Sequence, residues 1–149
     1  MRRGRLAESE ASARRVLDIR PTFPWTHFLL GCVALKRGEH DRVLDEMRKE
    51  PTDDGRQIGL AIAYHALGRK AYSDAALAQM IREHAQGDAF GIAEAYAYRG
   101  QYDEAMNWLN RAYAQKDPFM SYVGAEIEPL LPAGDPRLKA FMRRMNLPE

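Results

Sequence analysis

The sequence predicts an all-α fold in which pairs of helices stack into a right-handed α–α superhelix. The first observation is a regular spacing of four glycines beside helical stretches, Gly4, Gly38, Gly68 and Gly100, which lie 34, 30 and 32 residues apart. A period in the low thirties is typical of repeated two-helix units. The second observation is that helix-forming residues fill nearly the whole chain, and no alternating run is long enough to favour a strand.

Seven helices follow from the apolar periodicity, with the capping residues and the breaks between them. We expect them over about 6–19, 24–38, 41–49, 54–67, 73–85, 89–99 and 102–115. Thr22, the pair Asp53 and Asp54, and Asp88 are suited to cap the helices that follow them. Asp-Pro pairs at 117–118 and 135–136 start two further segments, because proline is favoured in a first helical turn. We expect these to be a short helix near 120–125 and a last helix over 136–145.

Length, composition and charge exclude several classes of protein. The 149 residues suffice for one domain with a core, and 46% hydrophobic with 29% charged residues indicate a globular chain. A net charge of +1 disfavours nucleic-acid binding by phosphate neutralisation. No apolar run reaches the length of a membrane span, and acidic residues follow the basic start where a signal peptide needs an apolar stretch. Cys32 is the only cysteine, so we expect a cytoplasmic protein without internal disulfides.

Ionisable residues that could carry chemistry are scattered along the chain. None of the four histidines, His27, His40, His65 and His84, forms the close pair that a metal site on a helix needs. The run Glu39-His40-Asp41 lies at a predicted turn, where charged capping residues are expected. We therefore expect no catalytic residue, no metal and no cofactor.

The helix pairs resemble the tetratricopeptide repeat. That repeat places Leu-Gly and Tyr on its first helix, and Ala, a large apolar residue and Ala on its second. Leu30-Gly31 matches directly, and the clearest copy consists of Ile92, Ala93, Tyr96, Tyr102, Ala105, Leu109 and Ala112, followed by Pro118. The resemblance implies about three and a half repeats over 1–118, the first without its first helix. A C-terminal cap over 119–149 then completes a single domain.

The tail after the repeats resembles the ending of certain bacterial multidomain signalling proteins. It contains Pro129-Leu130-Leu131, then Asp135-Pro136, and ends in Asn146-Leu147-Pro148. In those proteins the repeats follow an adenylate/guanylate cyclase or a winged-helix DNA-binding domain. Nothing in the chain resembles either domain. This resemblance therefore implies a bacterial regulatory part without catalytic residues of its own.

In tetratricopeptide stacks the first helix of each pair lines a concave groove that binds a peptide. The matching positions here are mostly apolar and aromatic, which favours an amphipathic helix or an apolar peptide as the ligand. The candidate groove residues are Phe28, Cys32, Leu35, Lys36, Ile58, Ile62, His65, Phe90, Glu94 and Tyr98. Chaperone-binding members carry polar residues where Phe28 and Cys32 stand, which argues against that function. The alternative is that the superhelix or the C-terminal cap covers this surface.

Two hypotheses for function follow. The first is a non-catalytic protein–protein interaction module, whose uncapped N-terminal end would pair with an upstream segment or with a second copy of the chain, forming a homodimer. The second is the C-terminal regulatory or sensory part of a bacterial signalling enzyme, such as an adenylate cyclase, or of a transcriptional regulator.

Overall fold

The computed structural model describes residues 2–146, and every regular element in this range is a helix, which confirms the all-α prediction. The longer helices are α1 Arg2–Ile19, α2 Thr26–Lys36, α3 His40–Lys49, α4 Asp53–Ala66, α5 Lys70–His84, α6 Ala89–Tyr98, α7 Tyr102–Ala114 and α8 Pro136–Arg144. Between α7 and α8 lie the short elements η1 Pro118–Tyr122, η2 Val123–Ile127 and η3 Glu128–Leu130. Within the described range, no helix combines the length and apolar character needed to cross a membrane.

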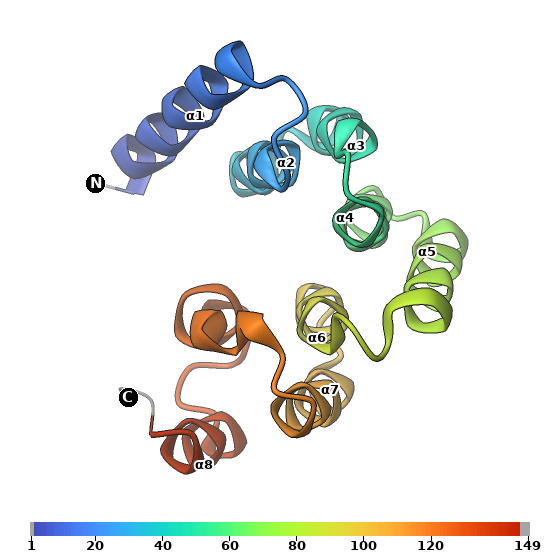
Figure 1. Ribbon diagram of the computed structural model, residues 1–149, viewed down its shortest axis with the longest axis vertical. Coiled ribbons are helices and arrows are strands. Elements are labelled where there is room, and N and C mark those ends of the chain that lie inside the picture. The colour runs from blue at the N-terminus through green and yellow to red at the C-terminus, as the bar shows by residue number, and fades with distance from the viewer. Residues whose placement is uncertain (1, 147–149) are drawn as a thin grey trace. The chain divides into compact units, whose positions relative to one another are not determined.

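The chain divides into two compact units, Met1–Ala78 and Gln79–Glu149, with the boundary inside α5. In the first unit, α1 packs against α2, α2 against α3, and α3 against α4 (Figure 1). Close packing surrounds Met47, whose side chain is completely buried. A Cβ atom added at Gly31 would lie 2.6 Å from Met47 Cε, and one added at Gly59 would lie 2.5 Å from Met47 Sδ. The two glycines therefore let α2 and α4 approach the same methionine of α3.

Three of the four repeated glycines end helices in the same way. Gly38, Gly68 and Gly100 have φ angles of 74°, 72° and 73°, in the left-handed region that glycine adopts without steric cost. The amides at and after each glycine bond back into the helix, as when Gly38 donates to the Leu35 carbonyl and Glu39 to the Ala34 carbonyl. This is the Schellman ending, so the predicted tight glycine turns at these three positions are confirmed.

Gly4 differs from the other three glycines. Gly4 lies within α1, which begins at Arg2, and it does not form a turn before the helix. The residues that follow it, through Ile19, have good helix propensity, and one glycine costs too little to end a helix near its start.

The predicted helix caps are confirmed at the aspartates before α6 and α8. Asp88 accepts from the Gly91 amide at 2.8 Å, and Asp135 accepts from the Arg137 amide at 2.9 Å. The predicted capping role of Thr22 is wrong, because α2 begins only at Thr26 and its N-cap residue, Trp25, makes no side-chain capping bond. A distant acid, Glu50, takes that role.

The start of α4 also differs from the prediction. Asp53 and Asp54 lie inside its first turn, where acidic residues favour the helix dipole, and the N-cap residue Thr52 makes no side-chain capping bond. The aspartates therefore support this helix through charge in its first turn.

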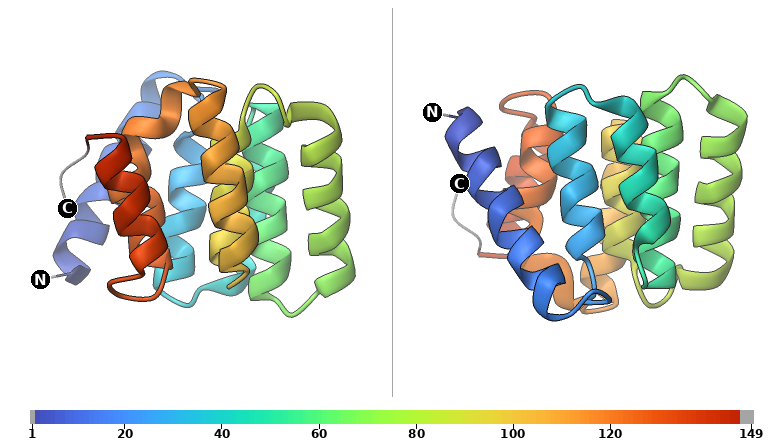
Figure 2. Two further views of the ribbon diagram at one scale, coloured as in Figure 1. Left: turned by 90° about the horizontal axis from the view of Figure 1, so that it is seen from below. Right: turned by 90° about the horizontal axis from the view of Figure 1, so that it is seen from above.

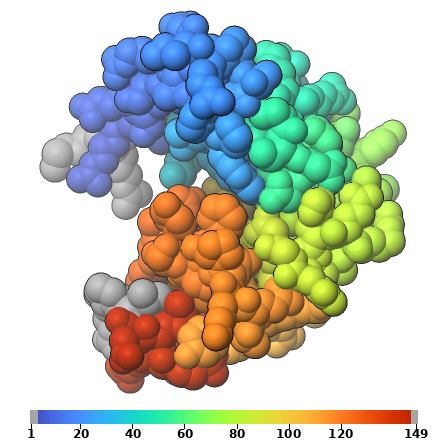
Figure 3. Space-filling model, viewed as in Figure 1, coloured from blue at the N-terminus to red at the C-terminus, as the bar shows by residue number. Residues whose placement is uncertain are grey.

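In the second unit α6 packs against α7, η2 packs against α6, and α8 packs against α7 (Figure 2). The apolar residues of these elements form one buried cluster that includes Phe90, Leu109, Val123, Ile127 and Phe141. The predicted single helix near 120–125 is instead a run of short 3-10 and π turns over 118–130. Figure 3 shows this run, in orange, beside α8, in red. Pro129 lies in the first positions of the last of these turns, where a proline is tolerated because the amide there has no partner within the turn.

Candidate functional site

The ten predicted groove residues lie on three helices in the two units. Most of them are buried, and Phe28, Cys32, Ile58, Ile62, Phe90 and Glu94 each expose less than a tenth of their surface. Leu35 and Tyr98 are half-buried, and Lys36 and His65 are exposed. A ligand could reach the last four directly, whereas the apolar side chains among the first six belong to the core.

Phe28 illustrates why an apolar position at the start of a first helix becomes buried. Its ring packs edge-on against Trp25, with 5.4 Å between ring centroids. Its amide donates to Glu50 Oε2 at 3.1 Å, and the Trp25 amide donates to Glu50 Oε1 at 2.9 Å. Because Glu50 follows α3 and is 1% exposed, this buried carboxylate joins the start of α2 to the end of α3. Phe28 therefore has a structural role in this unit.

Glu94 is the predicted groove residue that has a buried polar atom without a hydrogen-bond partner. The residue is 6% exposed, and its Oε1 atom makes no hydrogen bond. Burial, together with the nearby carboxylates of Glu126 and Asp88, raises the pKa of the Glu94 carboxyl to about 8. A buried carboxyl oxygen without a hydrogen-bond partner costs folding free energy. Glu94 is therefore a candidate for a functional role.

A row of aromatic rings in the second unit begins at Phe90, which lies one turn before Glu94 on α6. The centroids of Phe90 and Phe119 are 6.4 Å apart, and those of Phe119 and Tyr122 are 6.3 Å apart. Tyr122 is 52% exposed, and Glu126 of η2 is also exposed. We call Phe90, Glu94, Phe119, Tyr122 and Glu126 together the acidic–aromatic face. Its buried members lie on α6, and its exposed members lie on η1 and η2, which follow one another along the chain.

Sequence reasoning found only two members of this face, Phe90 and Glu94. A signal for the others was present, because Tyr122 and Glu126 repeat the aromatic-to-acid spacing of four residues that Phe90 and Glu94 show. The assignment of 119–149 as a cap outside the repeats hid this correspondence.

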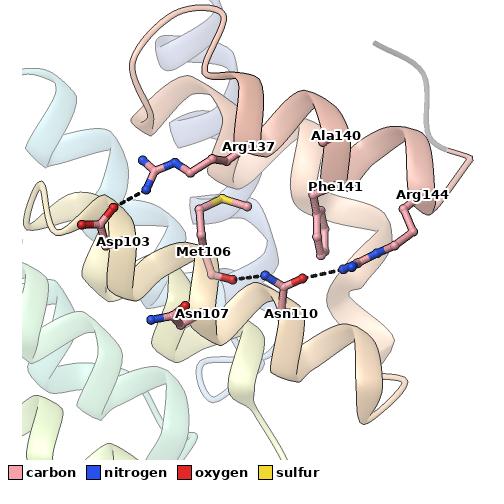
Figure 4. Close-up of a pocket in the computed structure, with 8 residues that line it drawn as sticks. All are labelled: Asp103, Met106, Asn107, Asn110, Arg137, Ala140, Phe141 and Arg144. Atoms are coloured by element: carbon pink, nitrogen blue, oxygen red, sulfur yellow. Dashed lines mark hydrogen bonds and ion pairs between the residues drawn. The ribbon is translucent and has the colours of Figure 1, made fainter.

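A cavity of about 540 Å³ lies between α7 and α8 (Figure 4). Arg137 forms ion pairs with Asp103 across the cavity and with Asp135, at 3.1 Å, on its own side. At the other end, Arg144 Nη2 donates to Asn110 Oδ1 at 2.5 Å. Through these contacts the two arginine side chains hold α8 against α7. The residues that line the cavity therefore serve to join the two helices.

The guanidinium of Arg144 also lies over two aromatic rings, 5.1 Å from the centroid of Tyr113 and 5.4 Å from that of Phe141. At the opposite end, the hydrogen bonds from Arg137 lower the pKa of the Asp135 carboxyl. Both arginines thus already have partners within the second unit. The acidic–aromatic face is therefore the better candidate for binding.

His27, one of the four histidines, has a defined partner. Its Nδ1 lies 2.8 Å from Glu46 Oε2, and both side chains are largely buried between α2 and α3. The contact satisfies a buried carboxylate and supports a structural role for this histidine.

No family model, no curated protein and no solved structure matches this chain.

Proposed function

We propose that this chain is a non-catalytic protein–protein interaction module built from helix-pair repeats of the tetratricopeptide type, with a peptide segment of a protein partner as its ligand. The observation that carries this proposal is the recurrence of one construction in both units. In each, a glycine with a positive φ angle joins two helices, and an acid shortly after the second helix accepts a hydrogen bond from an amide in the first turn of the first helix.

The recurrence extends to individual atoms. In the first unit the Phe28 amide donates to the carboxylate of Glu50, the residue that ends α3. In the second unit the Phe90 amide donates to Asp117 Oδ2 at 3.1 Å, and Asp117 follows the end of α7. Both acids precede a proline. Repeated helix pairs of this kind supply extended surfaces for binding, and the packing of their small and large residues implies no chemistry of its own.

Each unit has its own positions that a partner could contact, from the predicted groove in the first and from the groove and the acidic–aromatic face in the second. Lys36 and His65 are exposed, Tyr98 is half-buried, and Tyr122 and Glu126 are exposed. Large exposed aromatic residues with adjoining charges are typical of recognition surfaces, because tyrosine contributes both apolar area and a hydrogen-bonding group.

Peptide selection tests the proposal. The purified chain, immobilised, would be offered a displayed library of short random peptides, and enriched sequences would be synthesised and measured by fluorescence anisotropy. We expect at least one enriched peptide whose binding saturates, and whose affinity falls at least about tenfold in Tyr122→Ala. Asn107→Ala, an exposed change on α7, serves as the control. Failure to enrich any peptide above a selection without the protein would contradict the proposal.

Self-association would be a second use of the same module, and one observation in the first unit favours it. Ile19 is 81% exposed, Phe23 40% and Leu29 43%, so apolar side chains remain uncovered near the start of the chain. Light scattering across a concentration series would detect a homodimer, and Ile19→Ser with Leu29→Ser should then return the chain to a monomer. A monomer at all concentrations would reject this use.

A further inference from the structure

We propose that the acidic–aromatic face binds a lysine or arginine side chain of the partner, with the charged end of that side chain at Glu94. The inference rests on the proposed function and adds the chemistry of the ligand. It is argued wholly from residues of the second unit.

Glu94 provides the first reason. Its Oε1 atom is buried and makes no hydrogen bond, and the two charged groups that act on it, Glu126 and Asp88, are both acids. A buried carboxyl without a donor is a cost that a cationic donor would remove, since charge-assisted hydrogen bonds are the strong ones. Among the described residues, the charged groups that act on Glu94 therefore include no cation.

The aromatic row provides an independent reason. Phe119 packs against Phe90, which lies one turn before Glu94 on α6, and Tyr122 packs against Phe119. Aromatic faces attract cations through their quadrupole. Tyr122 and Glu126 are exposed, whereas Phe90 and Glu94 are buried. An aliphatic stem packed on the exposed ring of Tyr122, with its charge directed toward Glu94, fits this change from exposed to buried residues.

A metal ion fits the same residues less well. Calcium and magnesium require six or more oxygen ligands, whereas Asp88 Oδ1 is already engaged by the Gly91 amide as a helix cap. An ammonium or guanidinium group has three to five donors and needs only a few acceptors. We therefore assign a cationic side chain to this face.

The peptide selection described above distinguishes this inference from the proposed function when it is run in parallel on the wild type, on Glu94→Gln and on the control Glu104→Gln. Glu104 is an exposed carboxyl of α7 in the same unit. We expect peptides selected by the wild type and by the control to share a lysine or arginine at one position. Replacing that residue by norleucine should weaken binding at least tenfold to the wild type, and much less to Glu94→Gln.

Enriched peptides without a shared basic residue would overturn the inference and leave the proposed function standing. The same holds for a basic residue whose replacement weakens binding equally in Glu94→Gln. No enriched peptide at all would overturn both. If Glu94→Gln affects folding, Tyr122→Ala, which changes an exposed side chain of the same face, takes its place in the comparison with the wild type.

Proton release on peptide binding gives a second measurement. It would not differ between wild type and Glu94→Gln if Glu94 had only a structural role. The raised pKa of Glu94 keeps its carboxyl protonated at pH 7, and a bound cation would favour the ionised form. Calorimetric titration of the selected peptide in buffers of different ionisation enthalpy should show release of about one proton in the wild type and none in Glu94→Gln. Equal proton release in the two proteins would exclude Glu94 as the contact.

Discussion

Replacing Glu94 by glutamine should abolish a large pH dependence of stability. The carboxyl has a pKa of about 8 in the folded chain and an ordinary value of 4.5 when it is exposed. Between these two values the folded state keeps a proton that the unfolded state has lost. The stabilisation is therefore complete below pH 4.5 and is lost as the pH rises through about 8. A difference of about 3.5 pH units at 1.36 kcal/mol each corresponds to about 5 kcal/mol.

That magnitude is large beside the total stability of a domain, which is about 5–15 kcal/mol. Glutamine keeps the size and hydrogen-bonding shape of the protonated side chain but does not titrate. We expect Glu94→Gln to match the wild type within about 1 kcal/mol at pH 5. It should exceed the wild type by about 4 kcal/mol more at pH 9 than at pH 5.

Urea unfolding followed by circular dichroism, from pH 5 to pH 9, measures this directly. Glu104→Gln, which removes an exposed carboxyl from α7, should follow the wild type at every pH. If the free energies of unfolding of wild type and Glu94→Gln differ by the same amount at pH 5 and pH 9, the buried carboxyl is not the cause and the reasoning is refuted.

Three further substitutions test packing, capping and charge in the first unit by thermal and urea unfolding, with Gly87→Ala of the second unit as a control. Gly59→Ala should cost about 1–3 kcal/mol, because its Cβ would lie 2.5 Å from the buried Met47 Sδ. The Cβ of Gly87→Ala would have no atom within 4 Å, so this change should alter stability by less than about 0.5 kcal/mol. Equal effects of the two substitutions would contradict the packing account. Glu50→Ala should cost about 2–4 kcal/mol, since it leaves buried amides at the start of α2 without an acceptor, and a loss under about 0.5 kcal/mol would argue against the distant cap. Glu10→Gln should cost about 1 kcal/mol at low salt and less at high salt, because three arginines bond this acid and lower its pKa to about 2. The wild type should lose the same stabilisation as the pH falls from 4.5 to about 2. A loss that does not depend on salt would contradict an ionic origin.

Local signals were sufficient where a backbone conformation depends on one residue. Gly38, Gly68 and Gly100 end their helices as predicted, because a left-handed residue at a helix end strongly favours glycine. Asp88 and Asp135 cap the helices that follow them, since a short acidic side chain reaches amides only two or three residues away. Gly4 does not follow this pattern, because it lies inside α1 and ends no helix.

Contacts between distant residues were beyond local reasoning. Glu50 caps a helix that begins more than twenty residues earlier, and no local pattern indicates which distant acid will turn inward. Glu94 was placed on the correct helix but as one of several groove positions, and its burial without a partner depends on how η2 packs against α6.

The sequence by itself determined the helical class, the glycine turns and the helix limits to within a few residues, because these follow from periodicity, backbone conformation and short-range capping. Tertiary structure decided which of the predicted groove residues remain exposed and which acids become buried. It also brought Glu126 near Glu94 and Tyr122 against Phe119. The physical reason is that burial and electrostatic environment are properties of packed elements, and the sequence of each helix specifies its apolar face without specifying which charged group its neighbour will bring.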